Sequence, residues 1–296
     1  MTWTAGSIPD QTGRTVVITG ANSGIGLEAA KVLSRKGAHV VMACRDLGRG
    51  EAARQEVAGS SEVRRLDLAD LAAVRAFADG LEGDVDVLIN NGGVMAPPLA
   101  RTVDGFESQF GTNVVGHAAL TALLLPRLTD RVVWLSSMMH RFGHIDLADL
   151  NWEHRRYSRW PAYGQSKLAD LMLSYELQRR LTTQGSAVRS MAAHPGYSST
   201  NLQRNLGGRL VKPLQDLVAR TGLFIQTAEA GAWPTVYAAT TPDLAGGSYV
   251  GPSGPGEMTG TPHVVASSEP SRDAAVGKAL FDRVEEMAGV SFRLPA

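Results

Sequence analysis

The sequence predicts an α/β fold, a single doubly wound parallel sheet with helices on both faces. Up to about residue 195, short β-branched runs alternate with longer amphipathic segments, which is typical of successive βαβ units. The 296 residues are 44% hydrophobic and 20% charged, so the chain can bury a substantial core. Length alone suggests two domains, but no flexible linker or fixed repeat divides the chain. We therefore expect one domain over residues 1–296.

The first predicted elements form a complete βαβ unit. Residues 14–19 are expected to be a buried strand, residues 24–36 a helix that ends before Gly37, and residues 39–43 a second strand. Later strands are expected at residues 63–66, 85–89, 131–135 and 187–192, with helix-length segments between them. This order predicts a parallel sheet.

The remaining segments are less regular. Residues 163–181 have helical periodicity, and residues 274–288 are expected to form a final amphipathic helix. Residues 196–260 are rich in Gly and Pro and too long for a bare loop. We expect helices there that flank a substrate pocket.

Charge and cysteine content exclude several classes of protein. Lys plus Arg and Asp plus Glu are both 29, so no overall field favours nucleic acid or an anionic membrane. Cys44 is the only cysteine, which excludes an intrachain disulfide and a cysteine-rich metal site. We see neither a signal peptide nor a long apolar segment, and we expect a cytoplasmic protein without a membrane span.

A glycine-rich turn follows the first predicted strand. Its candidate binding residues are Gly20, Asn22, Ser23, Gly24, Ile25 and Gly26. Glycines let the backbone turn tightly and approach a pyrophosphate, which faces the amino end of the next helix. Such turns also occur without ligands, but the strand and helix around this one favour a bound nucleotide diphosphate.

Further motifs follow in a fixed order, and together they resemble the short-chain dehydrogenase/reductase family. They are Thr-Gly-x-x-x-Gly-x-Gly at residues 19–26, Asp67, Asn-Asn-Gly-Gly at residues 90–93, Asn113, Ser-Ser at 136–137, Tyr-x-x-x-Lys at 163–167 and Pro-Gly at 195–196. The usual Ala of the second glycine motif is replaced by Gly92. The resemblance covers residues 14 to about 200 and implies a Rossmann-type nucleotide-binding oxidoreductase.

The resemblance also assigns cofactor contacts. It implies that Asp67 and the Leu68 backbone meet the adenine, that Asn91 lines the cofactor, and that Pro195 and Gly196 border it. Asp67 could instead cap the following helix, and residues 90–91 could form a plain turn.

The end of the second strand bears on the choice of dinucleotide. An acidic residue there favours NAD, but this chain has Cys44 followed by Arg45. A guanidinium can pair with a 2′-phosphate, so we expect NADP rather than NAD. Arg45 could instead be solvated and contact nothing. The nearby carboxylate of Asp46, and the lack of a basic side chain at Ser23 in the glycine turn, both argue against NADP.

Tyr163 and Lys167 are the central catalytic candidates. Their spacing places them one helical turn apart on one face. A free phenol has a pKa near ~10, and a nearby cation lowers it, so Lys167 can make Tyr163 an acid/base catalyst. A Tyr-x-x-x-Lys motif taken alone is more often a pair on a helix surface. The companion motifs, in the expected order, favour a catalytic pair instead.

The resemblance implies the other catalytic roles. Ser137 would polarise the substrate oxygen, with Ser136 as a competitor in the wrong register, and Asn113 would help to hold a water in a proton relay. The implied reaction is direct hydride transfer between nicotinamide and a carbonyl or alcohol carbon. Asn113 could instead be an amide satisfied within the core.

The segment between Ser137 and Tyr163 is long, as in the retinol dehydrogenase and protochlorophyllide reductase-like branch. That similarity implies a hydrophobic small-molecule substrate. Met and aromatic side chains at such spacing are more often part of the core, but six apolar residues could line a pocket. They are Met138, Met139, Trp152, Trp160, Leu202 and Leu206. Arg155, Arg156 and Arg159 could meet an acidic group, but a solvated loop face is favoured. His140 and His144 have no third partner, so we expect no metal site.

Two functions remain at this point. The favoured one is an NADP-dependent carbonyl reductase or alcohol dehydrogenase. The alternative is a catalytically silent NADP-binding sensor or scaffold, which would be free to lose Ser137, Tyr163 or Lys167. Because all three are present, we favour the enzyme, and we leave the substrate, the direction and any homo-oligomer open.

Overall fold

The computed structural model describes residues 3–197 and 226–294. Within them, eight strands form one sheet in the order β3-β2-β1-β4-β5-β6-β7-β8. The strands are Thr15–Thr19 (β1), His39–Cys44 (β2), Ser61–Arg65 (β3), Val85–Asn90 (β4), Leu128–Leu135 (β5), Arg189–Ala193 (β6), Tyr249–Pro252 (β7) and Pro262–Val264 (β8). All neighbouring pairs are parallel except β7 and β8. The predicted doubly wound α/β fold is confirmed, whereas the single-domain organisation stays a prediction.

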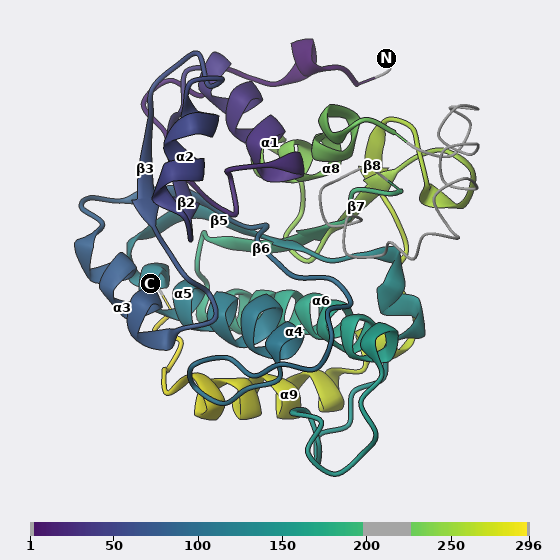
Figure 1. Cartoon of the computed structure of the whole chain (residues 1–296). Helices are drawn as coiled ribbons and strands as arrows, with labels where there is room; N and C mark the ends of the chain where they lie inside the picture. Colours follow the sequence, from purple (N-terminus) through teal and green to yellow (C-terminus); the bar gives the residue numbers. More distant parts are fainter. Residues whose placement is uncertain (1–2, 198–225, 295–296) are drawn as a thin grey trace, which may run out of the picture.

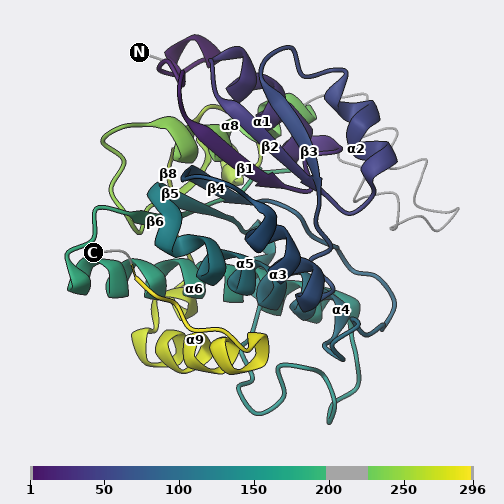
Figure 2. The same cartoon turned by 90° about the vertical axis from the view of Figure 1, so that its left-hand side faces the viewer.

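Helices cover both faces of the sheet (Figures 1 and 2). One face carries α1 (Gly24–Arg35), α2 (Leu47–Arg54) and α8 (Ala228–Thr240). The other carries α3 (Leu71–Gly80), α4 (Ser108–Phe110), α5 (Gly116–Leu124) and α6 (Arg159–Gln184), and α9 (Ala274–Ala288) packs on α5 and α6. None of the helices in the described ranges is long and apolar enough to cross a membrane.

The two faces of the sheet bury alternate residues of each strand. In β1, Val17 contributes to the core beneath α3, α5 and α6, while Val16 and Ile18 contribute to the core beneath α1 and α8. All three side chains are fully buried. A strand that is covered on both faces has no polar side, which explains the unbroken β-branched run in the sequence.

The six strands expected from the sequence all form, with ends that differ by at most a few residues. Strand β7 lies within residues 196–260, where we expected helices that flank a pocket, and β8 follows that segment; neither strand was expected. Helix α8 does form there, and part of the expected pocket segment, residues 198–225, lies outside the described residues. Residues 247–254 contain three Gly and one Pro, so β7 has no sequence pattern of its own and depends on pairing with β6.

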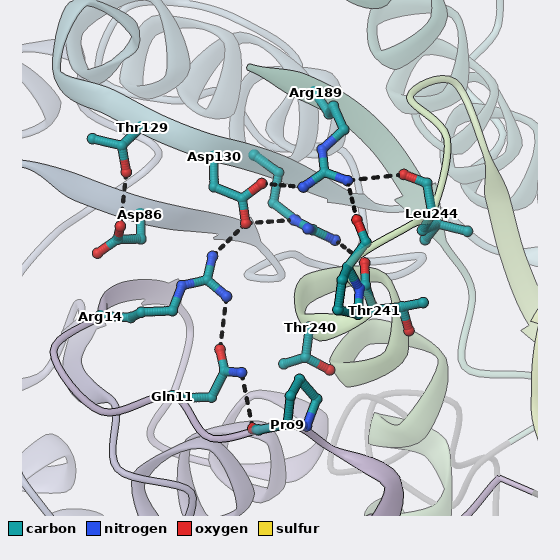
Figure 3. A network of polar contacts seen from close by, with 12 residues as sticks. Pro9, Gln11, Arg14, Asp86, Thr129, Asp130, Arg189, Thr240, Thr241 and Leu244 are labelled. Atoms are coloured by element: carbon teal, nitrogen blue, oxygen red, sulfur yellow. Dashed lines mark hydrogen bonds and ion pairs between the residues drawn. The ribbon is translucent and has the colours of Figure 1, made fainter. Parts of the chain in front are cut away.

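The amino-terminal edge of the sheet is held by one carboxylate among three guanidinium groups (Figure 3). Asp130 pairs with Arg14, Arg131 and Arg189, and its Oδ2 lies 2.9 Å from Arg131 Nε. Arg131 is only 1% exposed, and its Nη1 also donates to the carbonyl oxygens of Ala238 and Thr241, at 2.9 Å each. The network therefore ties β5 and β6 to the end of α8, opposite the edge where the predicted site residues gather.

The carboxyl ends of the parallel strands meet at the other edge. The chain leaves β1 toward β2 and β3 on one side, and returns to β4 on the other side of β1. Such a switch point in a parallel sheet leaves a crevice outside the strand ends where nucleotides bind. Thr19, at the end of β1, and Asn90, at the end of β4, lie at this point.

Candidate active site

The glycine turn lies between β1 and α1, as the sequence predicts. Gly20 has a φ of +67°, and a Cβ there would lie 2.9 Å from the Cα of Gly92. A Cβ on Gly26 would lie 2.5 Å from Asn91 Nδ2. The Ser23 side chain does not cap α1. Within the described parts of the chain, no side chain accepts from the first amides of this twelve-residue helix, and the close-packed turn suits a diphosphate.

The loop after β4 is bonded to the end of β1. Thr19 Oγ1 accepts hydrogen bonds from the main-chain N–H groups of Asn91, at 2.9 Å, and Gly92, at 2.8 Å. The Asn91 side chain donates in turn to the Thr19 carbonyl oxygen, at 2.7 Å. This loop therefore stands directly beside the glycine turn, where Asn91 was expected.

Asn113 is fully buried in a π-helical turn, η2 (Gly111–Val115), which precedes α5. Its Oδ1 accepts from Val94 N at 2.9 Å, and its Nδ2 donates to Val94 O and Ser166 Oγ, at 3.0 Å each. The side chain is therefore committed to the loop after β4 and to α6. A water relay would therefore have to use its main-chain carbonyl oxygen, which lies 2.8 Å from His117 Nδ1. Extra turns of this type are frequent at functional sites.

Tyr163 and Lys167 share one face of α6, and both are buried. Lys167 Nζ lies 5.9 Å from the centroid of the Tyr163 ring. It donates to the Leu135 carbonyl oxygen and to Asp170 Oδ2, at 2.8 Å each. The ammonium group is thus fixed at the carboxyl end of β5, where it can stabilise negative charge on the phenol oxygen.

The two serines after β5 have different surroundings. Ser136 is 2% exposed, and its hydroxyl donates to the Lys167 carbonyl oxygen at 2.7 Å. Ser137 is partly exposed, and its Oγ accepts a longer bond of 3.2 Å from Met139 N at the start of the 3₁₀ turn η4 (Met138–Phe142). Within residues 3–197 and 226–294, the Ser137 hydroxyl has no acceptor for its hydrogen, so it could donate to a substrate oxygen, and the choice of Ser137 over Ser136 stays a prediction.

The end of β2 offers a cation but no carboxylate. Cys44 is fully buried, and burial raises the pKa of its thiol to about 11, so it stays uncharged. Arg45 is exposed. Asp46 caps α2, with its Oδ1 accepting from Arg49 N at 3.0 Å. Arg45 and Asp46 are therefore both exposed after the strand, but the Asp46 carboxylate, 56% exposed, is bonded to its own helix.

Asp67 follows β3, and its Oδ1 accepts from Ala69 N at 3.0 Å. It does not cap α3, because Asp70 does so by accepting from Ala72 N and Ala73 N. Leu68 is buried beside Gly116. Pro195 and Gly196 follow β6, and the φ of Gly196 is +64°. All of these residues lie at carboxyl ends of strands, at the same edge as Tyr163 and Lys167.

The long segment before α6 has mixed roles. Trp152 is buried beneath the Arg155 guanidinium, which stands 3.8 Å above the ring and 3.4 Å from Asp149. These two residues therefore belong to the loop's own structure. Arg156 and Arg159 are exposed, as the favoured solvated interpretation requires. Trp160 is 41% exposed and packs edge-on against Tyr163 at 6.3 Å, whereas Leu202 and Leu206 lie outside the described residues.

His140 is a buried structural histidine. Its Nδ1 donates to the Ser137 carbonyl oxygen at 2.7 Å, and its Nε2 accepts from Ser268 N at 3.1 Å. Burial lowers its pKa to about 4, so it is neutral at neutral pH. In residues 3–197 and 226–294, no three His, Cys, Asp or Glu side chains are grouped as a metal site would require.

Three buried polar residues at this edge were missed by the sequence interpretation. Thr19 was quoted only as part of the glycine motif, Asp170 follows Lys167 by three positions, and His117 follows Asn113 by four. Helical spacing places the last two on the faces of their catalytic neighbours, which was the available signal.

Comparisons with known proteins agree with this arrangement. Residues 14–209 match the family model of the short chain dehydrogenases. Retinol dehydrogenase 13 of Homo sapiens is 43% identical over 259 residues, which cover 82% of this chain and 77% of that protein. The crystal structure of an uncharacterized protein from Mycobacterium paratuberculosis has a TM-score of 0.87 and 52% identity, covering 99% of this chain and 100% of that one. A structure assigned as an NAD(P)-dependent gluconate 5-dehydrogenase from Beutenbergia cavernae, with bound NADP, has a TM-score of 0.64 and 27% identity, covering 81% and 95%.

Proposed function

The chain belongs to the short chain dehydrogenase family, and on that premise we propose that it transfers hydride between NADP and a hydrophobic carbonyl or alcohol. The observation that carries the proposal is that Ser137, Tyr163 and Lys167 lie at the carboxyl end of β5, at the same edge of the sheet as the glycine turn that follows β1. An NAD(P)-dependent oxidoreductase follows from the family. The choice of NADP and of a hydrophobic substrate is our inference.

Arg45 supports the choice of NADP. It is an exposed guanidinium at the end of β2, next to a buried and uncharged thiol. A carboxylate at this point would repel a 2′-phosphate, whereas a guanidinium can pair with it. The bound NADP in the Beutenbergia cavernae structure agrees with this choice.

Exposed aromatic residues support a hydrophobic substrate. Trp160 stands beside Tyr163, and Phe142, at the end of the turn that starts after Ser137, is 77% exposed. Apolar surface next to polar catalytic groups is typical of sites for apolar small molecules. The similarity to a retinol dehydrogenase points the same way, since retinol is a largely hydrocarbon alcohol.

In this mechanism each of the three side chains has a defined role. Ser137 donates its hydroxyl hydrogen to the substrate oxygen and holds the reacting carbon in place. Tyr163 gives that oxygen its proton during reduction and takes it back during oxidation. The Lys167 cation stabilises the phenolate left behind and would also hold the nicotinamide ribose. Bound NADPH supplies the hydride.

A substrate panel tests the proposal. Purified protein is mixed with NADPH and a series of ketones and aldehydes of increasing apolar size, and the loss of nicotinamide absorbance is followed. We expect turnover that improves with apolar size and that disappears in Tyr163→Phe. Tight NADPH binding without turnover on any carbonyl, and without oxidation of the matching alcohols, would instead indicate the silent sensor.

A further inference from the structure

A closed ring of hydrogen bonds surrounds the loop after β4, and His117 completes it. The His117 side chain is on α5 and is 1% exposed. Its Nε2 lies 2.9 Å from Thr19 Oγ1, and its Nδ1 lies 2.8 Å from the Asn113 carbonyl oxygen. Thr19 holds the beginning of the loop through the N–H groups of Asn91 and Gly92, and Asn113 holds it further on through Val94.

The chemistry of the partners fixes the direction of each bond. A carbonyl oxygen only accepts, so His117 Nδ1 carries the hydrogen and donates it to Asn113. Thr19 Oγ1 already accepts two N–H groups, so its own hydrogen points to an acceptor. The candidates are His117 Nε2, at 2.9 Å, and the Ile89 carbonyl oxygen, at 3.4 Å, and the shorter contact is the better bond.

The ring therefore requires a neutral imidazole with its hydrogen on Nδ1. Burial lowers the pKa of His117 to about 3; the bond to Asn113 opposes the shift and the charge of Lys167 adds to it. A second hydrogen on Nε2 would face the Thr19 hydroxyl, which would then have to turn toward Ile89. The imidazole is thus neutral at neutral pH, as the ring requires.

We propose that His117 is a positioning residue that couples the cofactor loop to the catalytic turn. It would fix the Thr19 hydroxyl, and through it residues 91–92, which line the cofactor. It would also hold the Asn113 carbonyl oxygen and thereby the shape of the π-helical turn. This inference rests on the proposed function, because it assigns the loop to a dinucleotide and Asn113 to the proton relay.

Two amide variants separate the two ends of the imidazole. The side-chain nitrogen of His117→Asn reaches the position of Nδ1 and retains the bond to Asn113. The longer side chain of His117→Gln reaches the position of Nε2 and retains an acceptor for Thr19. His117→Phe keeps a flat ring and loses both bonds. Each variant is titrated with NADPH through the quenching of tryptophan fluorescence, and kcat is measured at saturating NADPH.

We expect His117→Phe to raise the Kd for NADPH about 10-fold and to lower kcat about 10-fold, as the loss of buried hydrogen bonds would. We expect His117→Gln to recover most of the Kd and His117→Asn to recover most of the kcat. The control is Thr121→Val on the same face of α5, which loses the 2.8 Å bond from Asn90 Nδ2 to Thr121 Oγ1 but leaves the ring intact. It should lower the Tm as the His117 variants do, with Kd unchanged.

The outcome that would overturn the inference is a Kd and a kcat within twofold of wild type in His117→Gln and His117→Asn alike. The inference would also be overturned if NADPH affinity and kcat fell equally in both amide variants and in Thr121→Val, in proportion to the fall in Tm. Failure of the proposed function looks different: the wild type itself would then bind no NADPH, or would bind it and reduce no carbonyl.

Discussion

Lys167 and Asp170 form a buried ion pair one turn along α6, with 2.8 Å between Nζ and Oδ2 and side chains only 7% and 2% exposed. Burial raises the pKa of Asp170 to about 6, although the positive charge of Lys167 opposes the rise. Burial alone would lower the pKa of Lys167, but the negative charges of Asp170 and of an ionised Tyr163 outweigh it and raise that pKa. At neutral pH the pair is therefore ionised, and Asp170 is the partner that takes up a proton as the pH falls.

Asp170 should give the enzyme an acid limb. The folded pKa, about 6, is above the ordinary value of 3.8, so the folded state binds the extra proton between these values and Lys167 loses its counter-charge there. We expect kcat/KM to fall below pH 6 in the wild type. Asp170→Asn should lower kcat/KM about 10-fold at pH 7.5, with no further fall near pH 6. Profiles from pH 5 to 9 measure both effects.

The control for this prediction is Asp79→Asn, which removes a carboxylate from the exposed end of α3. It should leave the acid limb of kcat/KM in place. A limb near pH 6 that persists in Asp170→Asn would assign the titration to another group.

Tyr163→Phe tests the acid/base role. The change keeps the ring packing against Trp160 and removes the hydroxyl group that carries the transferable proton, so we expect kcat to fall by ~10²-fold or more while NADPH binding survives. Steady-state kinetics on a substrate from the panel, with a parallel NADPH titration, provide the measurement. Turnover near that of the wild type would exclude Tyr163 as the proton donor.

The two serines should respond differently to alanine. Ser137→Ala removes the free hydroxyl at the site, and we expect kcat to fall by ~10²-fold with little change in Tm. Ser136→Ala removes a buried donor to the Lys167 carbonyl oxygen, and we expect it to cost about 1–2 kcal/mol of stability and less of the activity. Activity and thermal unfolding of both variants distinguish these results. The reverse pattern would show that Ser136 faces the substrate.

Asp130 should contribute to stability and not to catalysis, because it lies near the start of β5, whereas Lys167 is bonded to Leu135 at the end of that strand. Burial raises its pKa, but the hydrogen bonds and charges of Arg131 and Arg189 outweigh this and hold it below the ordinary value. The stabilisation is therefore present above pH 4 and is lost as the pH falls through the lowered folded pKa. We expect Asp130→Asn to cost about 2–4 kcal/mol at pH 7 in urea unfolding, since three guanidinium groups lose their anion.

Lys278→Ala is the matched control for Asp130→Asn. It breaks an exposed pair with Asp282, in which the lysine is 67% exposed, and such pairs contribute about 0.5 kcal/mol or less. Equal losses in the two variants would contradict the role given to the Asp130 network.

The sequence predicted those elements whose formation depends on local residues and missed those that depend on a partner strand. Helix α9 has the predicted bounds of residues 274–288, because its amphipathic pattern and the left-handed Gly289 that ends it are local. Strand β1 is equally local, as a β-branched run buried on both faces. Strand β8 has only three residues, two of them exposed, and it exists because β7 lies beside it. A short stretch of sequence does not show that such a partner strand will lie beside it.

The candidate site likewise combines features that linear spacing predicts with contacts between residues far apart in the sequence. Linear spacing was enough to predict that Tyr163 and Lys167 share a helix face and that the glycines follow a strand. It could not show that Thr19 meets His117, which is 98 positions away, or that the Asn113 side chain is occupied by Val94. Buried polar side chains need partners, but the sequence does not say which ones they find.

The remaining prediction concerns the choice of dinucleotide. Arg45 is exposed and follows the buried Cys44, and Asp46 is occupied as the cap of α2. We expect Arg45→Ala to raise the Kd for NADP about 10-fold, or about 1.4 kcal/mol, and to leave the Kd for NAD nearly unchanged. The reason is that only NADP has the ribose 2′-phosphate that the guanidinium would hold. Fluorescence titration of wild type and variant with both dinucleotides measures this difference.

A matched charge variant makes this test sharper. Arg49→Ala removes a guanidinium that is 78% exposed and lies on the first turn of α2, with its Nε 3.7 Å from Asp46 Oδ2. If general positive charge near the strand end attracted the phosphate, both variants would weaken NADP binding equally, and added salt would weaken it further in the wild type. A direct contact by Arg45 should instead make its loss several times larger than that of Arg49. Equal weakening of NADP and NAD in Arg45→Ala, or tighter binding of NAD by the wild type, would reject the choice of NADP, because a phosphate contact can discriminate only between ligands that differ in the phosphate.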